Sequence, residues 1–432
     1  MLRVSDINEN IDNISLLLSK RNIDVKDKLV EILKIDKSRR SIQSELDGVL
    51  AESNKLAKEI GDLFKSGQAE KASVLKEKAS SLKPKSKSLS EKLYSESERL
   101  KSLLLDIPNV PNKLVPTGSG DEDNLEVFKN GNIPDLNTTA LPHWELASKY
   151  DIIDFDLGNK ITGAGFPVYK NKGAKLQRAL INYFIDKNTE AGYKEIQVPI
   201  LINEDSGMGT GQLPDKEGQM YHVTNDNLYL APTAEVPVTN IYRDSIIKSS
   251  ELPIRLTSYT PCFRREAGSY GAHVRGLNRL HQFDKVEIVR IEQPENSYSA
   301  LEEMVDHVKG ILDELELPYR ILRLCGGDLG FTSCLTYDFE VYSAAQKKWL
   351  EVSSVSNFET FQANRLKLRI DNNGTKSLAH TLNGSSLALP RIVACILENF
   401  QTENSIKIPQ ALINYTGFEA VSYTHLTLPT KA

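Results

Sequence analysis

The chain has 432 residues, of which 40% are hydrophobic and 26% are charged, and its formal net charge is -5. This length predicts two or three domains with a sizeable core. Because the chain has no excess of basic residues, any contact with nucleic acid must depend on local basic patches. The polar start and the lack of an apolar run of ~20 residues argue against a signal peptide and a membrane span. The 4 scattered cysteines form no CxxC pair, so we expect no zinc site and a cytoplasmic protein without membrane contact.

Residues 1–110 carry aliphatic side chains at helical spacing among many Lys, Glu and Ser residues. Two such runs flank a turn that contains Ser66 and Gly67, so two long helices should lie antiparallel with their narrow apolar stripes in contact. We therefore expect an N-terminal domain that consists of a coiled-coil arm. Pro84 lies inside the second run and predicts a kink or break near Lys83.

Basic residues cluster around Pro84: Lys76, Lys78, Lys83, Lys85, Lys87 and Lys92. Two interpretations stay open on the charges alone. The lysines form either an ordinary solvated helix face or a surface for the backbone of a polyanion.

Residues 111–125 are rich in Pro, Gly and acidic side chains, which is typical of a linker. The following domain, 126–418, alternates strand-like runs at 195–202, 286–291, 319–324, 338–344 and 348–355 with helical runs at 174–191, 294–315 and 387–402. Several of these strands are joined by loops rather than crossover helices, so we predict an α+β fold with a mostly antiparallel sheet flanked by helices. Residues 419–432 show no core-like pattern, and we expect a disordered or non-native tail.

The segment from Thr260 to Val289 predicts a strand that ends at Phe263, a glycine-rich loop and a strand that returns from His281. Phe283 and Glu287 are four residues apart and share one face of that strand, with Arg279 beside them if the strand reaches it. Arginine over a sheet clamps phosphates with paired donors, a phenyl ring can stack on a purine, and a carboxylate can accept from an ammonium or amino group. The chain contains no P-loop and no GxGxxG motif, so a nucleotide is bound in another way.

Here the sequence resembles a known family. FRREAG followed by RGLNRLHQF and KVE resembles the second signature motif of class II aminoacyl-tRNA synthetases, in the form typical of bacterial-type seryl-tRNA synthetases. TAE at 233–235, GMGTGQLP at 207–214, LEVSSVSNFETFQANR at 350–365 and HTLNGSSLALPR at 380–391 resemble further elements of that family, the last being the third class II motif. The first motif corresponds weakly to 173–199 and implies a homodimer interface.

The resemblance implies an ATP site. Arg264 would bind the α-phosphate and the substrate carboxylate, Glu266 would lie near the adenine or the 3′-terminal nucleotide, and Phe283 would stack on adenine. Arg279 and Arg391 would hold the outer phosphates, so that Arg264, Glu266 and Arg391 form the catalytic set. The full predicted ATP set is Arg264, Arg265, Glu266, Arg279, Phe283, Glu351, Val352, Ser353, Ser354 and Arg391.

The resemblance also implies that Glu351 and Ser354 hold Mg²⁺, whose hardness suits oxygen ligands. The serine pocket would be lined by Thr233, Ala234, Glu235, Arg264, Glu287, Asn383 and Ser385. The substrate carboxylate is itself the nucleophile, so no side-chain nucleophile is required. We therefore expect Cys262 to be a small strand residue and His281 and His380 to be structural.

The family would activate L-serine with ATP and transfer it to tRNA(Ser), whose long extra arm the helical arm grips through backbone and shape. Whether a selenocysteine tRNA is also charged stays open. The alternatives are a synthetase for proline or threonine, a synthetase-like carrier-protein charger without an arm, and a non-enzymatic regulatory or scaffolding paralogue. The TAE and NGSS elements and the arm disfavour the first two. The third is disfavoured because the chain keeps its phosphate-binding arginines and the metal ligand, namely Arg264, Arg279, Arg391 and Glu351. Ser386, where many relatives have glycine, and Pro390 depart from the family pattern.

Overall fold

A computed structural model of the chain describes residues 1–136, 139–266 and 275–422. The chain divides into two compact units, one formed by Met1–Ser19 and Ile23–Pro108 and the other by Lys20–Asn22 and Asn109–Ala432. We call them the helical unit and the sheet unit. Within the described ranges, no helix combines the length and the apolar character that crossing a membrane would require.

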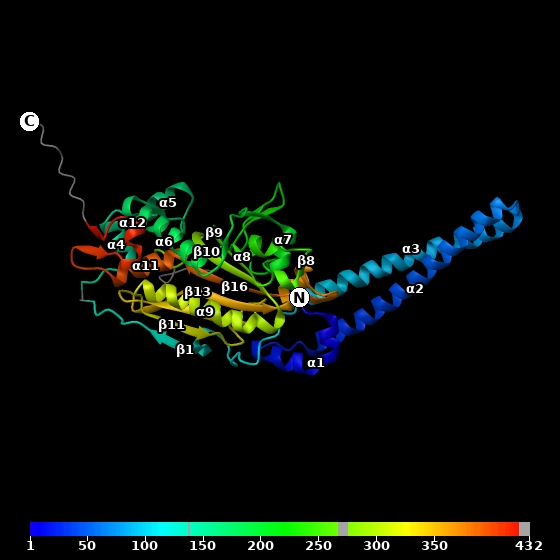
Figure 1. The fold of residues 1–432 in the computed structure, drawn as a ribbon, viewed down its shortest axis with the longest axis horizontal. Helices are drawn as coiled ribbons and strands as arrows, with labels where there is room; N and C mark the ends of the chain where they lie inside the picture. The colour runs from blue at the N-terminus through cyan, green and yellow to red at the C-terminus, as the bar shows by residue number, and fades with distance from the viewer. Residues whose placement is uncertain (137–138, 267–274, 423–432) are drawn as a thin grey trace, which may run out of the picture. The chain divides into compact units, whose positions relative to one another are not determined.

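The helical unit consists of α1 (Val4–Leu18), α2 (Lys26–Lys65) and α3 (Ala69–Leu105). A short turn in which Gly67 adopts a φ of 73° joins α2 to α3, and a left-handed turn of this kind favours glycine. The two long helices pack antiparallel, with Leu46, Val49 and Leu89 buried between them (Figure 1). The predicted coiled-coil hairpin is therefore confirmed.

Pro84 does not interrupt the second long helix. The helix α3 continues through it from Ala69 to Leu105, so of the predicted kink or break near Lys83 the break is wrong. Pro84 is exposed, and water can therefore serve the backbone carbonyl that proline leaves without a partner. Leu82 and Leu89 hold α3 against α2 on either side of the proline.

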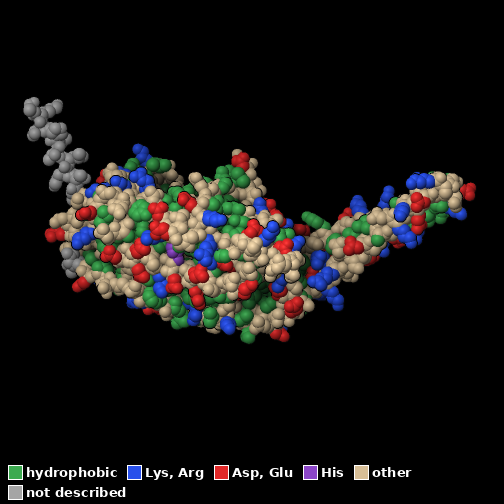
Figure 2. Space-filling model, viewed as in Figure 1, with side chains coloured by type: hydrophobic (Ala, Val, Ile, Leu, Met, Phe, Trp, Pro, Cys, Tyr) green, Lys and Arg blue, Asp and Glu red, His purple; other side chains and the backbone are tan. Residues whose placement is uncertain are grey.

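The basic side chains of α3 divide into two sets. Lys78, Lys85 and Arg99 form ion pairs with α2 carboxylates, namely Glu52, Glu45 and Glu31. The second set is exposed and makes no ion pair within the described residues; it comprises Lys71, Lys76, Lys83, Lys87, Lys92 and Lys101. Figure 2 shows basic, acidic and hydrophobic side chains interleaved along this hairpin rather than a continuous basic stripe.

The main sheet of the sheet unit has the strand order β1-β11-β12-β13-β16-β10-β9-β4. All neighbouring strands are antiparallel except β4 and β9, so the predicted α+β fold with a mostly antiparallel sheet is confirmed. Its strands are β1 (Leu125–Asn130), β4 (Lys194–Glu195), β9 (Ile254–Phe263), β10 (Gln282–Glu292), β11 (Tyr319–Arg323), β12 (Leu335–Ser343), β13 (Lys348–Glu359) and β16 (His380–Ala388).

The two faces of this sheet differ in character. One face packs on the helices α6 (Asn171–Glu190), α9 (Ser297–Glu314) and α11 (Leu389–Asn399), and strand residues such as Val286, Ile288 and Val355 are buried there in the main core (Figure 1). Alternate residues of the same strands point to the other face, which carries hydroxyl, amide and charged side chains. We call this second surface the polar face.

Shorter elements complete the unit. The helices are α4 (His143–Lys149), α5 (Phe155–Ile161), α7 (Glu204–Thr210), α8 (Glu235–Asn240), α10 (Thr360–Leu366) and α12 (Ile413–Thr416). Two small sheets have two strands each: β2 (Ile153–Asp154) with β3 (Val168–Tyr169), and β17 (Ser405–Lys407) with β18 (Ala420–Ser422). A third consists of β5 (Leu201–Asn203), β6 (His222–Val223) and β7 (Leu228–Leu230). A fourth consists of β8 (Ile246–Lys248), β14 (Arg369–Asn372) and β15 (Thr375–Leu378).

Three expectations about element boundaries are corrected. The run 195–202 is not one strand: β4 ends at Glu195 and β5 starts at Leu201, because Pro199 has no amide to give a ladder. The last helix begins at Leu389 rather than 387, since β16 continues to Ala388 and Pro390 occupies the first helical turn. The start of the expected disordered tail is part of the fold, because Ala420–Ser422 form β18, which pairs with β17 and buries Val421 in the main core. The rest of the expected tail, 423–432, lies outside the described residues.

Candidate functional site

The polar face is built first on the hairpin of β9 and β10. In its register Cys262 lies opposite Phe283, Thr260 opposite Lys285 and Ser258 opposite Glu287. Phe283 and Glu287 therefore share a face, as predicted, and Lys285 lies between them on that face. Arg279 precedes the strand, which starts at Gln282, and so belongs to the preceding turn.

The polar face continues across the next strands. Ser385 of β16 lies opposite Glu287, and Asn383 lies opposite Ser356 of β13. Ser354 then pairs with Asp338 of β12. Because residues directly opposite one another in an antiparallel pair point to the same side, these positions form one continuous surface of hydroxyl, amide and carboxylate groups.

A β-bulge brings Glu351 onto the same side as Ser354. Residues three apart on a regular strand point to opposite faces. Here the register shifts so that Ser354 lies opposite Asp338 and Glu351 lies opposite Glu340, with Val352 as the extra residue. The bulge therefore restores a common face for the two predicted metal ligands.

Asp338 joins this pair and was missed by the sequence analysis. Burial, followed by the charge of Glu351, raises the pKa of the Asp338 carboxyl well above its usual range. Its Oδ1 atom is buried and has no hydrogen-bond partner among the described residues. Its place opposite Ser354 depends on strand register, which no local signal in the sequence gives. The described residues contain no cluster of three or more His, Cys, Asp or Glu side chains that could hold a metal by themselves, so a cation here needs hydroxyl or substrate oxygens too.

Arg264 stands at the end of β9, with its guanidinium 5.3 Å from the ring centroid of Phe283. Its amide donates to the carbonyl of His281 at 2.9 Å, which fixes the start of the loop. The neighbouring Arg265 lies over the ring of Tyr221 at 5.6 Å. The predicted loop glycines Gly268 and Gly271 lie outside the described residues.

Two of the predicted ATP-binding side chains contact each other. Arg279 donates from Nε to Glu266, and the two form an ion pair. Arg391, in the first turn of α11, donates from Nε to the carbonyl of Asn278 at 3.0 Å and from a terminal nitrogen to the carbonyl of Glu351 at 2.6 Å. Arg391 is thereby fixed between the turn before Arg279 and the bulge of β13.

The charge of Glu287 is almost completely buried, with a side-chain exposure of 1%. Its Oε2 atom forms an ion pair with the Lys285 ammonium at 2.5 Å and accepts a hydrogen bond from the Thr233 hydroxyl at 3.1 Å. Burial raises the pKa of Glu287, while Lys285 and Thr233 oppose that rise. Its Oε1 atom is buried and, within the described ranges, has no partner. Lys285 was missed by the sequence analysis, although the period of two that placed Phe283 and Glu287 also places it.

Glu235 forms a second buried carboxylate at the start of α8. Burial, followed by the charge of Glu287, raises its pKa to about 7. Gln362 of α10 donates to Glu235 Oε1 at 2.6 Å, and Thr381 of β16 donates to Gln362 at 2.7 Å. Two carboxyl groups therefore lie near one lysine and one arginine, an arrangement that suits a ligand that carries both an ammonium and a carboxylate.

Some predicted site residues can contribute only their backbone. The side chains of Val352 and Ala234 are buried in hydrophobic clusters, and Ser353 donates to the carbonyl of Ser385 at 2.5 Å. Cys262 is a buried strand residue whose thiol pKa is raised by burial. His281 forms a hydrogen bond with the hydroxyl of Tyr221 through Nδ1. His380 forms one with the hydroxyl of Ser297, and burial lowers the pKa of His380 to about 4.

Family models match both units. The model described as the seryl-tRNA synthetase N-terminal domain matches residues 1–111, and the model of the tRNA synthetase class II core domain (G, H, P, S and T) matches residues 221–400. The chain is 47% identical to a protein named Serine--tRNA ligase from Salinibacter ruber, over 98% of this chain and 99% of the relative. It is 46% identical to a protein of the same name from Nautilia profundicola, over 96% and 100%.

A solved structure agrees with these matches. The crystal structure of seryl-tRNA synthetase from Pyrococcus horikoshii complexed with ATP superposes with a TM-score of 0.89, at 30% identity, over 98% of this chain and 100% of that one.

The buried pair of Lys285 and Glu287 yields a stability prediction. Lys285→Met leaves the Glu287 carboxylate buried without its cation, so the free energy of unfolding should fall by about 3–5 kcal/mol. The double variant Lys285→Met/Glu287→Gln should lose clearly less than the sum of the single losses. Urea denaturation measures both, with the exposed Lys376→Met as control. Additive losses would show that the two side chains do not interact.

Proposed function

Because the chain belongs to the seryl-tRNA synthetase family of class II aminoacyl-tRNA synthetases, we propose that it activates L-serine with ATP and then transfers the serine to the 3′-terminal adenosine of tRNA(Ser). The first step gives seryl-adenylate and pyrophosphate. The observation that carries the proposal is the common face on which Arg264, Phe283 and the free oxygen of Glu287 lie. Charging of a selenocysteine tRNA stays an open part of the proposal.

We infer that ATP lies over the hairpin of β9 and β10. Phe283 offers a ring for adenine, and Arg264 lies close enough to that ring for the α-phosphate to meet its guanidinium. Arg279 and Arg391 would hold the outer phosphates, with paired donors that match phosphate oxygens. Phosphates would then compete with Glu266 for Arg279, which would release Glu266 toward the adenine or the 3′-terminal nucleotide.

Serine would occupy the pocket beside Glu287. Its carboxylate would pair with Arg264, and its ammonium or hydroxyl would donate to the unpartnered Oε1 of Glu287. Thr233, Glu235, Asn383 and Ser385 would complete the lining, and Ala234 would contribute backbone. Alanine lacks the hydroxyl and would leave a buried polar group unpaired, which is a strong basis for rejection.

The proposed chemistry is an in-line displacement. A carboxylate oxygen of serine attacks the α-phosphorus, the bond from that phosphorus to the bridging oxygen of pyrophosphate breaks, and pyrophosphate leaves with the electron pair. Arg264 neutralises charge on the α-phosphate, and the fixed positions of the two substrates supply the orientation. Arg264, Glu266 and Arg391 form the proposed catalytic set. Cys262 is not used.

The residues present fit a magnesium ion. Glu351 and Ser354 share a face through the bulge, and the unpartnered buried Oδ1 of Asp338 lies beside them, so the site offers the oxygen ligands that Mg²⁺ prefers. We propose that Glu351 and Ser354 hold the ion and that Asp338 supports it. When bound, Mg²⁺ supplies charge neutralisation at the phosphates.

The helical unit is proposed to bind the long extra arm of the tRNA. Four of the exposed α3 lysines without an ion pair, Lys76, Lys83, Lys87 and Lys92, lie around Pro84 and supply cations for phosphates. A homodimer is proposed from the first class II motif at 173–199, which includes most of α6. A cytoplasmic location is proposed because all four cysteines, which lie within the described ranges, are free. A non-enzymatic regulatory or scaffolding role is disfavoured by the intact set of Arg264, Arg279, Arg391 and Glu351.

The proposed activity is tested by pyrophosphate exchange. The purified chain should exchange pyrophosphate into ATP with serine but not with threonine or proline, and Arg264→Ala should lower that rate roughly 100-fold or more, because it removes the group that neutralises the α-phosphate. The matched control is Arg255→Ala, which removes an arginine that pairs with Glu303 and should leave exchange unchanged. Exchange with threonine alone, or full activity of Arg264→Ala, would refute the proposal.

The raised pKa of Glu235 predicts a pH dependence. Below the pKa of about 7 the carboxyl takes up a proton, so the charge that favours the serine ammonium is lost and the KM for serine should rise as the pH falls through 7. Glu235→Gln should bind serine more weakly and with little pH dependence in this range. Steady-state exchange between pH 6 and pH 8 measures this, and an equal pH dependence in both proteins would contradict it.

A further inference from the structure

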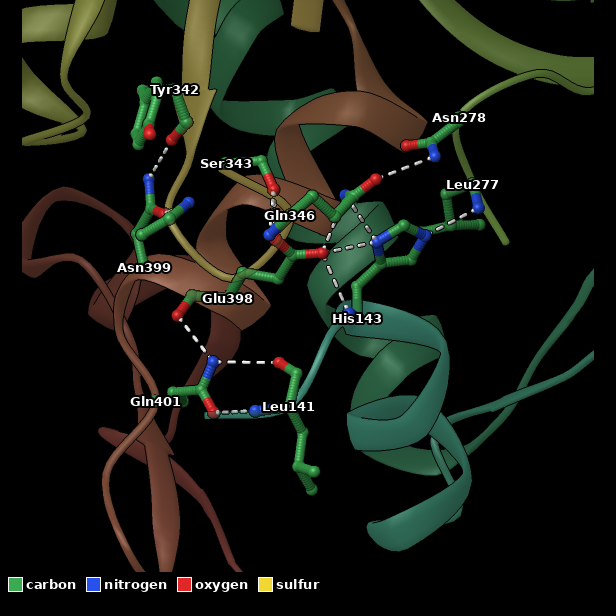
Figure 3. A network of polar contacts seen from close by, with 11 residues as sticks. Leu141, His143, Leu277, Asn278, Tyr342, Ser343, Gln346, Glu398, Asn399 and Gln401 are labelled. Atoms are coloured by element: carbon green, nitrogen blue, oxygen red, sulfur yellow. Dashed lines mark hydrogen bonds and ion pairs between the residues drawn. The ribbon is translucent and has the colours of Figure 1, made fainter. Parts of the chain in front are cut away.

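A buried pair of His143 and Glu398 lies behind the proposed ATP site. Both side chains have an exposure of 0%, and His143 Nδ1 lies 2.7 Å from Glu398 Oε1. The amide of His143, at the start of α4, also donates to that oxygen at 2.9 Å. Burial opposes ionisation of Glu398, but the hydrogen bonds that it accepts from His143 and Ser343 outweigh this effect and hold the pKa of Glu398 below its ordinary value. Figure 3 shows the pair within its polar network.

The second ring nitrogen of His143 faces the exit of the glycine-rich loop. The amide of Leu277 lies 2.8 Å from His143 Nε2. A backbone N–H can only donate, so Nε2 must carry the lone pair. The ring proton therefore sits on Nδ1 and is donated to Glu398, which makes His143 a neutral bridge with its two nitrogens in opposite roles.

The loop exit rests directly on the imidazole ring. Gly276 adopts a φ of 68°, and a Cβ atom at this position would lie 2.2 Å from His143 Nε2. Only glycine permits this approach, because any side chain would have to displace the ring or the turn. The turn 276–278, which immediately precedes Arg279, thus packs against His143.

The same turn is fixed from its other side. Asn278 donates to Gln346 Oε1 at 2.9 Å, and Gln346 donates to Glu398 Oε1 at 2.8 Å. The carbonyl of Asn278 accepts from Nε of Arg391 at 3.0 Å. Arg391 and Glu398 both lie on α11, so one helix carries both a proposed phosphate ligand and the carboxylate that orients His143.

We propose that His143 is a positioning residue for ATP binding, which holds the turn 276–278 so that Arg279 and Arg391 converge on the outer phosphates. The inference rests on the proposed function, since it takes those two arginines as phosphate ligands. His143 does not touch the substrate. It acts through the Leu277 amide on one side and through Glu398 on the other.

The test compares two substitutions of His143 by pyrophosphate exchange, with separate KM values for ATP and serine. His143→Phe keeps the ring but removes both hydrogen bonds, and it should raise the KM for ATP about 10-fold while the KM for serine stays within about twofold. His143→Gln retains one donor and one acceptor and should recover part of the ATP affinity. The matched control is His307→Phe on α9, which removes a ring hydrogen bond to Asn188 of α6 and should leave both KM values unchanged.

A second variant that keeps the pair of His143 and Glu398 is needed in case His143→Phe does not fold. Gly276→Ala leaves His143 bonded to Glu398 but pushes the turn off the ring, so it too should raise the KM for ATP selectively. Far-UV circular dichroism establishes that each variant is folded. If His143→Phe does not fold, Gly276→Ala decides the question. An unchanged KM for ATP in the folded variants, or an equal rise for serine, would overturn the proposal.

Arg391→Ala separates this inference from the proposed function. If Arg391→Ala raises the KM for ATP and the folded His143→Phe does not, the positioning role fails while the ATP site stands. If Arg391→Ala has no effect on the KM for ATP, the assignment of the phosphate ligands fails, and the inference about His143 fails with it.

Discussion

The buried carboxylate of Glu287 is the constraint around which the proposed pocket is organised. A carboxylate at 1% exposure cannot stay charged without compensation. Lys285 and Thr233 supply that compensation at one oxygen only, and the other oxygen has no partner among the described residues. The fold therefore holds a buried acceptor without a partner in the described ranges, where a hydrogen-bond donor on a ligand is strongly favoured. The nearby Glu235, whose pKa is about 7 because of burial and Glu287, cannot add a full second charge without a cation.

Strand geometry turns this constraint into a site. Period-two alternation gives β10 a core face with Val286 and Ile288 and a polar face with Phe283, Lys285 and Glu287. The helices behind the core face hold the sheet rigid, and the bulge at Val352 turns Glu351 toward Ser354 and Asp338. Rigid strands are a precise support for groups that must meet two substrates at once. Arg391 joins the two parts, since it contacts both the turn that precedes Arg279 and the backbone of β13.

The hairpin of β9 and β10, the arm and the antiparallel sheet could be predicted because each depends on local periodicity and turn residues. Phe283 and Glu287 share a face for the same reason, and Lys285 could have been found by the same rule. Other features depend on long-range packing, which a single sequence does not reveal. Asp338 meets Ser354 only through register, His143 meets Leu277 across 134 positions, and residues 420–422 are ordered only because β17 lies beside them. Pro84 does not break α3, as the sequence led us to consider, because its exposed side of the helix tolerates a lost hydrogen bond. The roles of the site residues came from family resemblance rather than from the residues alone.

A crystal structure of the chain with a non-hydrolysable seryl-adenylate analogue would test the central claim most directly. Adenine should stack on Phe283, the α-phosphate mimic should lie at Arg264, and the ammonium or hydroxyl of the seryl group should lie within hydrogen-bond distance of Glu287 Oε1. Lys285 should remain on Oε2. An analogue bound away from the polar face, or a seryl group that leaves Glu287 Oε1 without a partner, would contradict it.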